Sequence, residues 1–177
     1  MDYNAIICEG AAEEAIIEIL LEHSALIIKN DDYLINRSPI RCRSANNFLE
    51  NYLNFKFNSK VKIYRILDSK NENFNISNRN KKIYGSRIEV KNIITSPEIE
   101  MLIILSENKF DDYNKHHLKP SEYCKQILKI SSVKDYDFVK EYFNDVNKLL
   151  NAIKLYKQKK NVKYQTLFDL LEDEYKI

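Results

Sequence analysis

The strongest constraint on the fold comes from three short apolar segments that alternate with helical patterns. Each has the length of a β-strand. The first, from Tyr3 to Cys8, has the apolar content of a buried strand, and the others run from Val61 to Leu67 and from Ile88 to Thr95. Amphipathic helical patterns follow them at residues 13–23, 45–55 and 98–107. Because parallel strands need a crossover that is usually helical, this alternation predicts an α/β fold with a mostly parallel sheet flanked by helices.

Weaker patterns lie between these segments. Residues Ser38 to Arg43 favour a short extended segment, and the Asn-rich stretch from Asn71 to Asn80 favours a loop because it has few apolar residues. Pro97 stands where a proline commonly opens a helix, so we expect the helix at residues 98–107 to begin directly after it.

After Asp111 the chain contains helical patterns only. They lie at residues 121–128, 136–143, 146–156 and 164–171 and are joined by short polar links. We therefore expect two parts, an α/β domain at residues 1–110 and a helical C-terminal extension at residues 111–177 that packs on it.

Composition is typical of a cytoplasmic protein. Of the 177 residues, 44% are hydrophobic and 31% are charged, and the apolar runs are far shorter than the about 18 residues of a membrane span. We expect no signal peptide, because no basic flank stands before Ile6. The three cysteines Cys8, Cys42 and Cys124 have no C-x-x-C spacing, which favours a reduced chain without a zinc site.

Carboxylates gather where the predicted strands end. Glu9 follows the first strand, with Glu13 one helical turn later; Asp68 ends the second strand, and Glu98 and Glu100 follow the third. In open α/β sheets, ligands bind outside the carboxyl ends of the strands. Oxygen ligands converging there favour Mg²⁺ or Mn²⁺, as one ion or as the ion pair that promotes phosphodiester cleavage. Any one of these carboxylates is also explained as a helix cap or a solvated strand end.

The first strand and its turn, IICEGAAEEAII, resemble the first motif of the TOPRIM domain, an apolar strand followed by E-G-x-x-E at the start of a helix. Topoisomerases, primases, ribosomal RNA maturases and nucleases of the overcoming-lysogenization-defect family share this domain. Its second motif, a strand ending in D-x-D, is similar to YRILDSKNENF, in which Asp68 matches the first aspartate and Lys70 replaces the second. In nuclease branches with such a replacement, later acidic residues share metal ligation; here these are Glu98 and Glu100, with Glu72 a weaker candidate. The resemblance covers about residues 3–107.

This resemblance implies a TOPRIM-like, Rossmann-like fold and Mg²⁺-dependent phosphodiester chemistry. By motif position, Glu9 would be a ligand or general base and Asp68 a central metal ligand, while Glu13, Glu98 and Glu100 would complete the metal site. The chain has no counterpart of the tyrosine-bearing domain of topoisomerases or of the zinc module of primases, so hydrolysis of DNA or RNA is the reaction implied. Lys70 would either stabilise charge at the scissile phosphate or only reduce repulsion among the carboxylates.

Small TOPRIM proteins resemble effectors of bacterial phage defence and abortive infection, toxins that often work with an ATPase partner; a homo-oligomer is also open. The departure at Lys70 favours a second class, a non-catalytic TOPRIM-like module that binds a metal ion or a protein. A nucleotidyl-transferring enzyme is a third alternative.

Basic residues that suit phosphate occur in two regions. Arg41 and Arg43 lie in the segment RSPIRCR, and the arginine fork matches phosphate in a bidentate manner. Residues 109–163 hold thirteen lysines against seven acidic residues, and Lys119 and Lys125 are the candidate nucleic-acid contacts there. An exposed structural loop and a lysine-rich composition are the alternative explanations.

Overall fold

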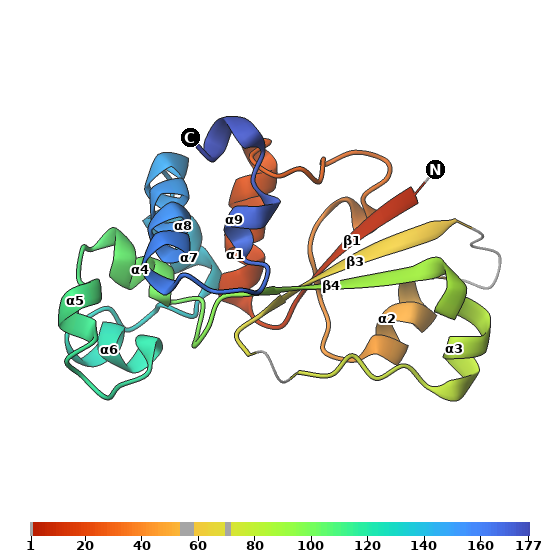
Figure 1. Cartoon of the computed structure of the whole chain (residues 1–177), viewed down its shortest axis with the longest axis horizontal. Helices are drawn as coiled ribbons and strands as arrows, with labels where there is room; N and C mark the ends of the chain where they lie inside the picture. Colours follow the sequence, from red (N-terminus) through yellow and green to blue (C-terminus); the bar gives the residue numbers. More distant parts are fainter. Residues whose placement is uncertain (1, 54–58, 70–71) are drawn as a thin grey trace.

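The computed structural model describes residues 2–53, 59–69 and 72–177, and a four-stranded parallel sheet runs through its centre (Figure 1). The strand order is β2-β1-β3-β4. The strands are β1 (Asp2–Cys8), β2 (Ile40–Arg41), β3 (Lys60–Leu67) and β4 (Ile88–Ile94). All three pairings are parallel, as the alternation of strands and helices predicted.

Nine α-helices connect and cover these strands within the described residues. They are α1 (Ala11–Glu22), α2 (Ala45–Tyr52), α3 (Asn78–Tyr84), α4 (Met101–Ser106), α5 (Phe110–Tyr113), α6 (Pro120–Gln126), α7 (Tyr136–Tyr142), α8 (Val146–Lys160) and α9 (Leu167–Leu170). Short 3₁₀ turns lie at Ile35–Arg37, Gly85–Arg87 and Asp173–Tyr175. None of the helices in this part of the chain combines the length and the apolar character needed to cross a membrane.

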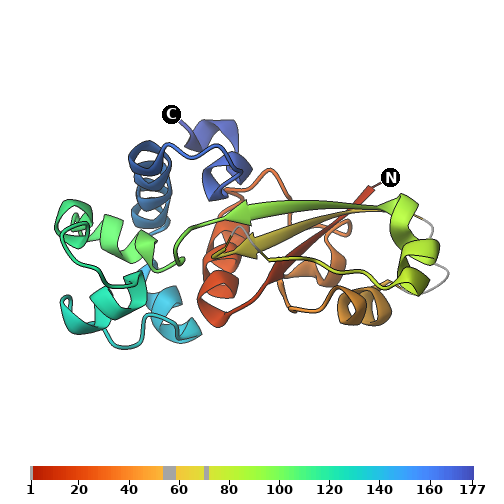
Figure 2. The ribbon, with the colours of Figure 1, turned by 60° about the horizontal axis from the view of Figure 1, so that its bottom comes forward.

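The central strands bury both faces because their side chains alternate between two hydrophobic cores. Ile6 and Ile66 face the core formed with α1 and the C-terminal helices. Ile7, next to Ile6 in β1, and Ile63, three residues before Ile66 in β3, face the core formed with α2 and α3. Figure 2 shows α2 and α3 on one side of the sheet and α1 toward the carboxyl ends of the strands.

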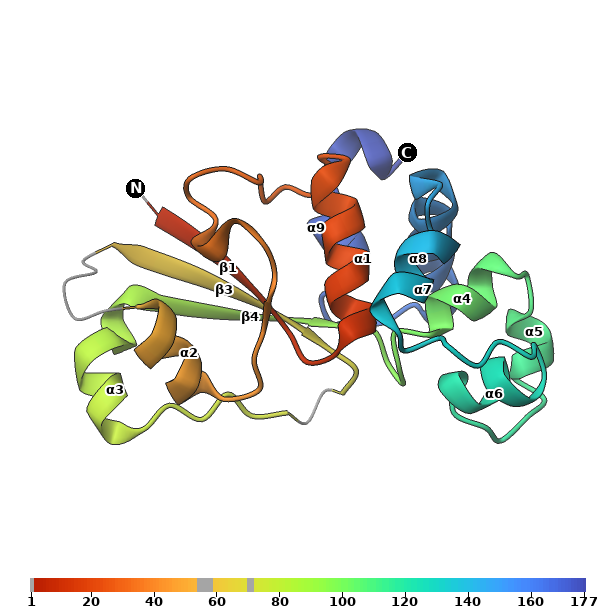
Figure 3. The ribbon, with the colours of Figure 1, turned by 180° about the vertical axis from the view of Figure 1, so that it is seen from behind.

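The C-terminal helices share one core with the start of the chain. Helix α7 packs on α1 and α8 packs on α4 (Figure 3). The end of α9 and the segment after it pair with the loop after α1. The N–H of Ile27 donates to the carbonyl oxygen of Leu170 at 2.9 Å, and the N–H of Glu172 donates to that of Ala25 at 2.9 Å. The first and last quarters of the chain therefore pack together.

Two local predictions were wrong. The segment from Asn71 to Asn80 does not remain a loop throughout, because α3 begins at Asn78, where the Ser77 hydroxyl accepts a hydrogen bond from the N–H of Asn80. Pro97 does not open a helix either. Residues 98–100 form a turn with i to i+3 hydrogen bonds, and α4 starts only at Met101.

Candidate metal and catalytic site

The turn between β1 and α1 holds the Glu13 carboxylate over the backbone of Gly10. Gly10 is the N-cap of α1, and the Glu13 side chain accepts hydrogen bonds from the N–H groups of Gly10 and Glu13. A Cβ added to Gly10 would lie 2.5 Å from Glu13 Oε2. The lack of a side chain at Gly10 leaves room for this close approach. Backbone conformation is not the reason for a glycine here, since a φ of −130° is open to any residue. Glu13 is therefore a helix cap as well as a candidate ligand.

Asp68, at the end of β3, binds the turn that precedes α4. Its Oδ1 accepts a hydrogen bond from the N–H of Ile99 at 2.9 Å. On either side of Ile99, Glu98 accepts a hydrogen bond from the N–H of Ser121 at 2.8 Å, and Glu100 is 3% exposed. Glu100 Oε2 is the one buried side-chain oxygen or nitrogen of the described residues that has no hydrogen-bond partner.

Glu13, Asp68, Glu98 and Glu100 form one group, which we call the inner carboxylate cluster. Burial, followed by repulsion from Glu13 and Glu100, raises the pKa of Asp68 to about 8. Burial also raises the pKa of Glu100 to about 7, with repulsion from Glu98 and Glu13 adding to it. Burial raises the pKa of Glu13 as well. These groups are costly to ionise together without a cation.

Lys134, in the link before α7, supplies the nearest positive charge. Its Nζ lies 3.6 Å from Glu98 Oε1 and 4.0 Å from Glu100 Oε1. The attraction of Glu100, Glu98 and Asp68 outweighs desolvation and raises the pKa of Lys134. Because its side chain is 61% exposed, solvent screens this charge, and it offsets the repulsion only in part.

Glu9 lies in a second group, with Arg65 and Glu72. Arg65 is 2% exposed, and its guanidinium is 3.6 Å from Glu9 Oε1 and 3.9 Å from Glu72 Oε2. Burial, followed by a hydrogen bond with Glu72, raises the pKa of Glu9 to about 7, while Arg65 and Arg43 act in the opposite direction. The charges that act most strongly on Asp68 come from Glu13 and Glu100, so Glu9 and Asp68 belong to neighbouring but separate groups.

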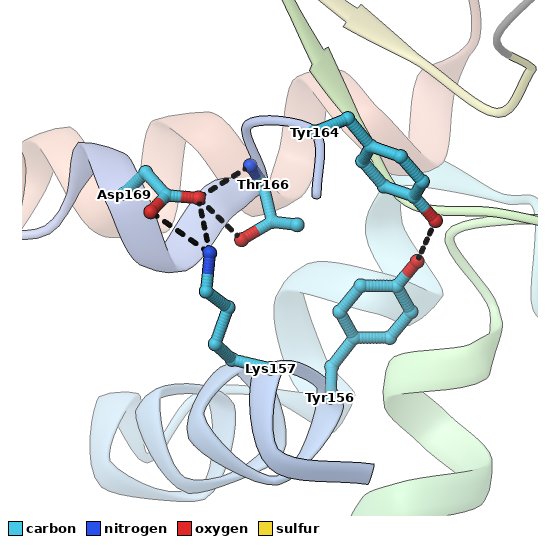
Figure 4. A network of polar contacts seen from close by, with 5 residues as sticks. All are labelled: Tyr156, Lys157, Tyr164, Thr166 and Asp169. Atoms are coloured by element: carbon cyan, nitrogen blue, oxygen red, sulfur yellow. Dashed lines mark hydrogen bonds and ion pairs between the residues drawn. The ribbon is translucent and has the colours of Figure 1, made fainter. Parts of the chain in front are cut away.

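A tyrosine from α8 supports the turn that carries Glu98 and Glu100. The Tyr156 hydroxyl accepts a hydrogen bond from the N–H of Ser96 at 2.8 Å and lies 3.1 Å from its carbonyl oxygen. Figure 4 shows that Tyr156 also meets the hydroxyl of Tyr164, at 3.2 Å. The last helices of the chain thus reach the site indirectly.

Asp169 binds the segment after α8 to that helix through hydrogen bonds and an ion pair. Its carboxylate accepts from Lys157 Nζ at 2.9 Å and from the backbone N–H and hydroxyl of Thr166 at 2.7 and 2.9 Å (Figure 4). This ion pair and cap hold the segment against α8, the helix from which Tyr156 projects.

The predicted phosphate-binding residues have different surroundings. Arg41 Nε forms an ion pair with Glu14 Oε2 at 2.8 Å, whereas the exposed Arg43 lowers the pKa of both Glu9 and Glu13 and so lies beside both groups. Lys119 and Lys125 are exposed, at the start and in the last turn of α6. Lys70 lies outside the described residues.

Sequence patterns assigned no role to Lys134, and they placed Arg65 among the arginines near the candidate phosphate contacts without pairing it with a carboxylate. Arg65 had a usable signal, because a charged residue inside a buried strand needs a partner. No sequence pattern indicated the role of Lys134. It lies near Glu98 and Glu100 only because the link before α7 packs against residues far away in the sequence.

The donor set fits a hard divalent cation in its chemistry. The inner carboxylate cluster offers only oxygen ligands. The pKa is raised for three of its carboxyl groups, those of Glu13, Asp68 and Glu100, and the buried Glu100 Oε2 has no hydrogen-bond partner among the described residues. Among the described residues, however, no three His, Cys, Asp or Glu side chains stand where they hold one ion together. Binding an ion would require at least one of the carboxylates to change its conformation.

Comparisons with known proteins do not assign this chain to a family. No protein-family model matches it, and no curated protein or solved structure is significantly similar to it.

Proposed function

We propose that this chain is a TOPRIM-type nuclease that hydrolyses phosphodiester bonds of DNA or RNA with Mg²⁺ or Mn²⁺. One observation carries the proposal: at the carboxyl edge of a parallel sheet, the half-buried Asp68 and the buried Glu100 lie against further carboxylates, and Glu100 Oε2 has no partner among the described residues. A protein gains nothing in stability from such an arrangement, so the arrangement is best explained by a bound cation.

The residues that would hold the ion are Asp68 and Glu100, with Glu13 and Glu98 beside them. When bound, the ion would neutralise these carboxylates and polarise a phosphate oxygen. Asp68 and Glu100 would lose their protons on binding, because the raised pKa of each keeps a large fraction of it protonated at neutral pH.

Glu9 suits the proton-transfer role. Its pKa of about 7 lies near neutral pH, where a general base is most effective. The buried guanidinium of Arg65 orients the Glu9 carboxylate, and the hydrogen bond with Glu72 gives the proton a neighbouring acceptor. The exposed Arg43 next to it would bind the phosphate backbone, with Lys119 and Lys125 as weaker contacts.

The test is a cleavage assay. Purified chain is incubated with plasmid, single-stranded DNA or total transfer RNA, with Mg²⁺, with Mn²⁺ or with a chelator. We expect metal-dependent cleavage of at least one substrate, lost in Glu9→Gln and Asp68→Asn and retained in Glu14→Gln, whose carboxylate pairs with Arg41 instead. Cleavage that survives both Glu9→Gln and Asp68→Asn would contradict the assignment of the site.

One observation favours a second candidate, a non-catalytic metal- or protein-binding module. Lys134 already places an ammonium group next to Glu98 and Glu100, and no three carboxylates of the described residues stand ready for one ion. Calorimetry with Mg²⁺ separates the two candidates, because metal binding without cleavage of any of these substrates would support the module.

The biological setting rests on the resemblance alone. We propose a cytoplasmic phage-defence or abortive-infection effector, acting with an ATPase or another protein partner. Expression in a bacterial host tests this, since a toxic nuclease should arrest growth in the active form and not as Asp68→Asn.

A further inference from the structure

The outer edge of β4 carries a row of unpaired backbone groups. The N–H of Thr95 donates to Leu67 on β3, while the N–H of Ile94 points the other way and donates to Gln165 at 2.8 Å. Successive residues of a strand direct their backbone groups to opposite sides. Ile88, Val90 and Asn92 therefore direct their N–H and C=O groups away from β3.

Nothing in the described part of the chain pairs with these groups. The segment at Gln165 covers the edge only at Ile94, and β3 is the one strand beside β4. β4 forms the outer margin of the sheet (Figure 2). Val90, in the middle of this edge, is 39% exposed, an unusual fraction for a valine inside a strand. The edge contains no proline, one of the devices that prevent strand addition.

The charges along this edge are self-complementary. Glu89 and Lys91 flank Val90, lie on the same face of the sheet and are 3.6 Å apart. If two β4 strands pair antiparallel about a two-fold axis through Val90, Glu89 of each copy stands opposite Lys91 of the other. In the same register Ile88 stands opposite Asn92, so outward backbone groups meet outward backbone groups. A parallel arrangement of two copies would not be two-fold symmetric.

We propose that a second copy of this chain pairs with the outer edge of β4 from Ile88 to Asn92, so that the sheets of two molecules become continuous. Val90 exchanges two backbone hydrogen bonds with Val90 of the second copy, and Ile88 exchanges two with Asn92 at each end. Two Glu–Lys contacts lie on one face and the Val–Val contact on the other. Such cross-strand pairs are the units that stabilise a sheet.

The test uses charge reversal and sedimentation equilibrium over a concentration series. We expect the unmodified chain to be in a monomer–dimer equilibrium. Glu89→Lys places lysine opposite Lys91, and Lys91→Glu places glutamate opposite Glu89, so each single variant should raise the dissociation constant about tenfold. The double variant, Glu89→Lys with Lys91→Glu, restores opposite charges and should dimerise like the unmodified chain.

Mixing the two single variants gives the sharpest outcome. Glu89→Lys carries positive charges at both positions, and Lys91→Glu carries negative charges at both. The mixture should therefore form heterodimers more tightly than either variant forms homodimers, whose dissociation constants are raised about tenfold. A monomer at every concentration, or dimers whose dissociation constant is the same in all variants, would overturn the proposal. The first result would mean that Lys91 protects the edge against pairing; the second would place the interface elsewhere.

Amide hydrogen exchange provides a readout that does not depend on the charges. Exchange of the Val90 and Asn92 amides should slow as the concentration of unmodified chain rises, whereas the Asn4 amide, bonded to Tyr33, should be unaffected. Equal exchange of Val90 in dilute and concentrated samples, with dimers present, would contradict pairing through β4.

Discussion

The carboxylate of Asp68 is fixed by the backbone N–H of Ile99, 2.9 Å away and on a different segment of the chain. This bond joins the end of β3 to the turn before α4. As a result, Glu98 and Glu100, which flank Ile99, are brought to the same place as Asp68. This contact between a strand end and a turn links Asp68 directly to the segment that carries Glu98 and Glu100.

Stability should fall as pH rises through the range in which the inner carboxylate cluster ionises. Asp68 has a pKa of about 8 in the folded chain and about 4 when unfolded, so the folded state holds the extra proton between these values. Stability is therefore greatest at the acidic end of this range and is lost toward pH 8. Each pKa unit corresponds to about 1.4 kcal/mol, and we expect a loss on the order of 3 kcal/mol between pH 5 and pH 8. Urea unfolding at several pH values measures it.

The matched variant for this prediction is Asp68→Asn. It removes the charge but not the size of the side chain, so its stability should depend less on pH and should exceed that of the unmodified chain at pH 8. A steeper loss in Asp68→Asn than in the unmodified chain would show that Asp68 is not the group responsible.

Divalent cations should stabilise the chain more at pH 8 than at pH 5.5. Ion and proton compete for the same carboxylates, and Asp68 and Glu100 are largely protonated at pH 5.5. The increase in Tm with Mn²⁺ should be several degrees at pH 8 and disappear in Glu100→Gln. Glu22→Gln, on the exposed end of α1 next to Lys140, should keep the full increase. Calorimetry in two buffers of different ionisation enthalpy should detect proton release on binding.

Gly10→Ala should separate metal binding from stability. The added Cβ meets the Glu13 carboxylate, the movable end of a side chain, so the cost in unfolding free energy should be about 1 kcal/mol or less. Glu13 must move away from its cap position, however, and the affinity for Mn²⁺ should change. Gly85→Ala is the control, because a Cβ there contacts nothing. Calorimetry and urea unfolding on both variants give the comparison.

Arg65→Met should destabilise the chain by about 3 kcal/mol at pH 8, because it leaves Glu9 and Glu72 without their buried countercharge. The cost should be smaller at pH 5, where Glu9 is protonated. Arg41→Met removes an exposed ion pair with Glu14 and should cost less than about 1 kcal/mol at either pH. Equal costs for the two variants in urea unfolding would mean that Arg65 acts through packing alone.

Tyr156→Phe should loosen the turn after β4. The N–H of Ser96 loses its acceptor, which costs about 1–2 kcal/mol for a partly buried group. The Ser96 amide should then exchange faster with solvent. Tyr164→Phe removes a different neighbour of the Tyr156 hydroxyl and leaves both contacts with Ser96 in place, so Ser96 exchange should stay slow.

The strands and the long helices could be predicted from the sequence because their signals are local. Val61 to Leu67 is rich in β-branched and aromatic residues and has the length of a strand, and it lies within β3. The α4 boundary could not be predicted, because the turn at residues 98–100 is stabilised by Asp68, a residue 31 positions away from Ile99 in the sequence. The α3 helix was missed although Ser77 is a common N-cap residue, since the segment has few apolar residues.

The candidate site could also be predicted only in part: the sequence indicates where its residues lie but not which of them interact. Strand ends identify Glu9 and Asp68 as residues at the carboxyl edge of the sheet, because parallel strands end at one edge. Their partners follow from side-chain geometry, which no spacing encodes. Glu9 interacts most strongly with Glu72 and Arg65, whereas Asp68 interacts with Glu13 and Glu100.

The bond between Tyr156 and Ser96 spans 60 residues, and this has a consequence for the order of synthesis. On the ribosome, all of the proposed metal-binding carboxylates emerge before α8, whose tyrosine holds the turn beside them. A nascent chain that ends before α8 thus carries every acidic residue of the site without its support. The turn beside the carboxylates therefore gains this support only after the chain has been synthesised through α8.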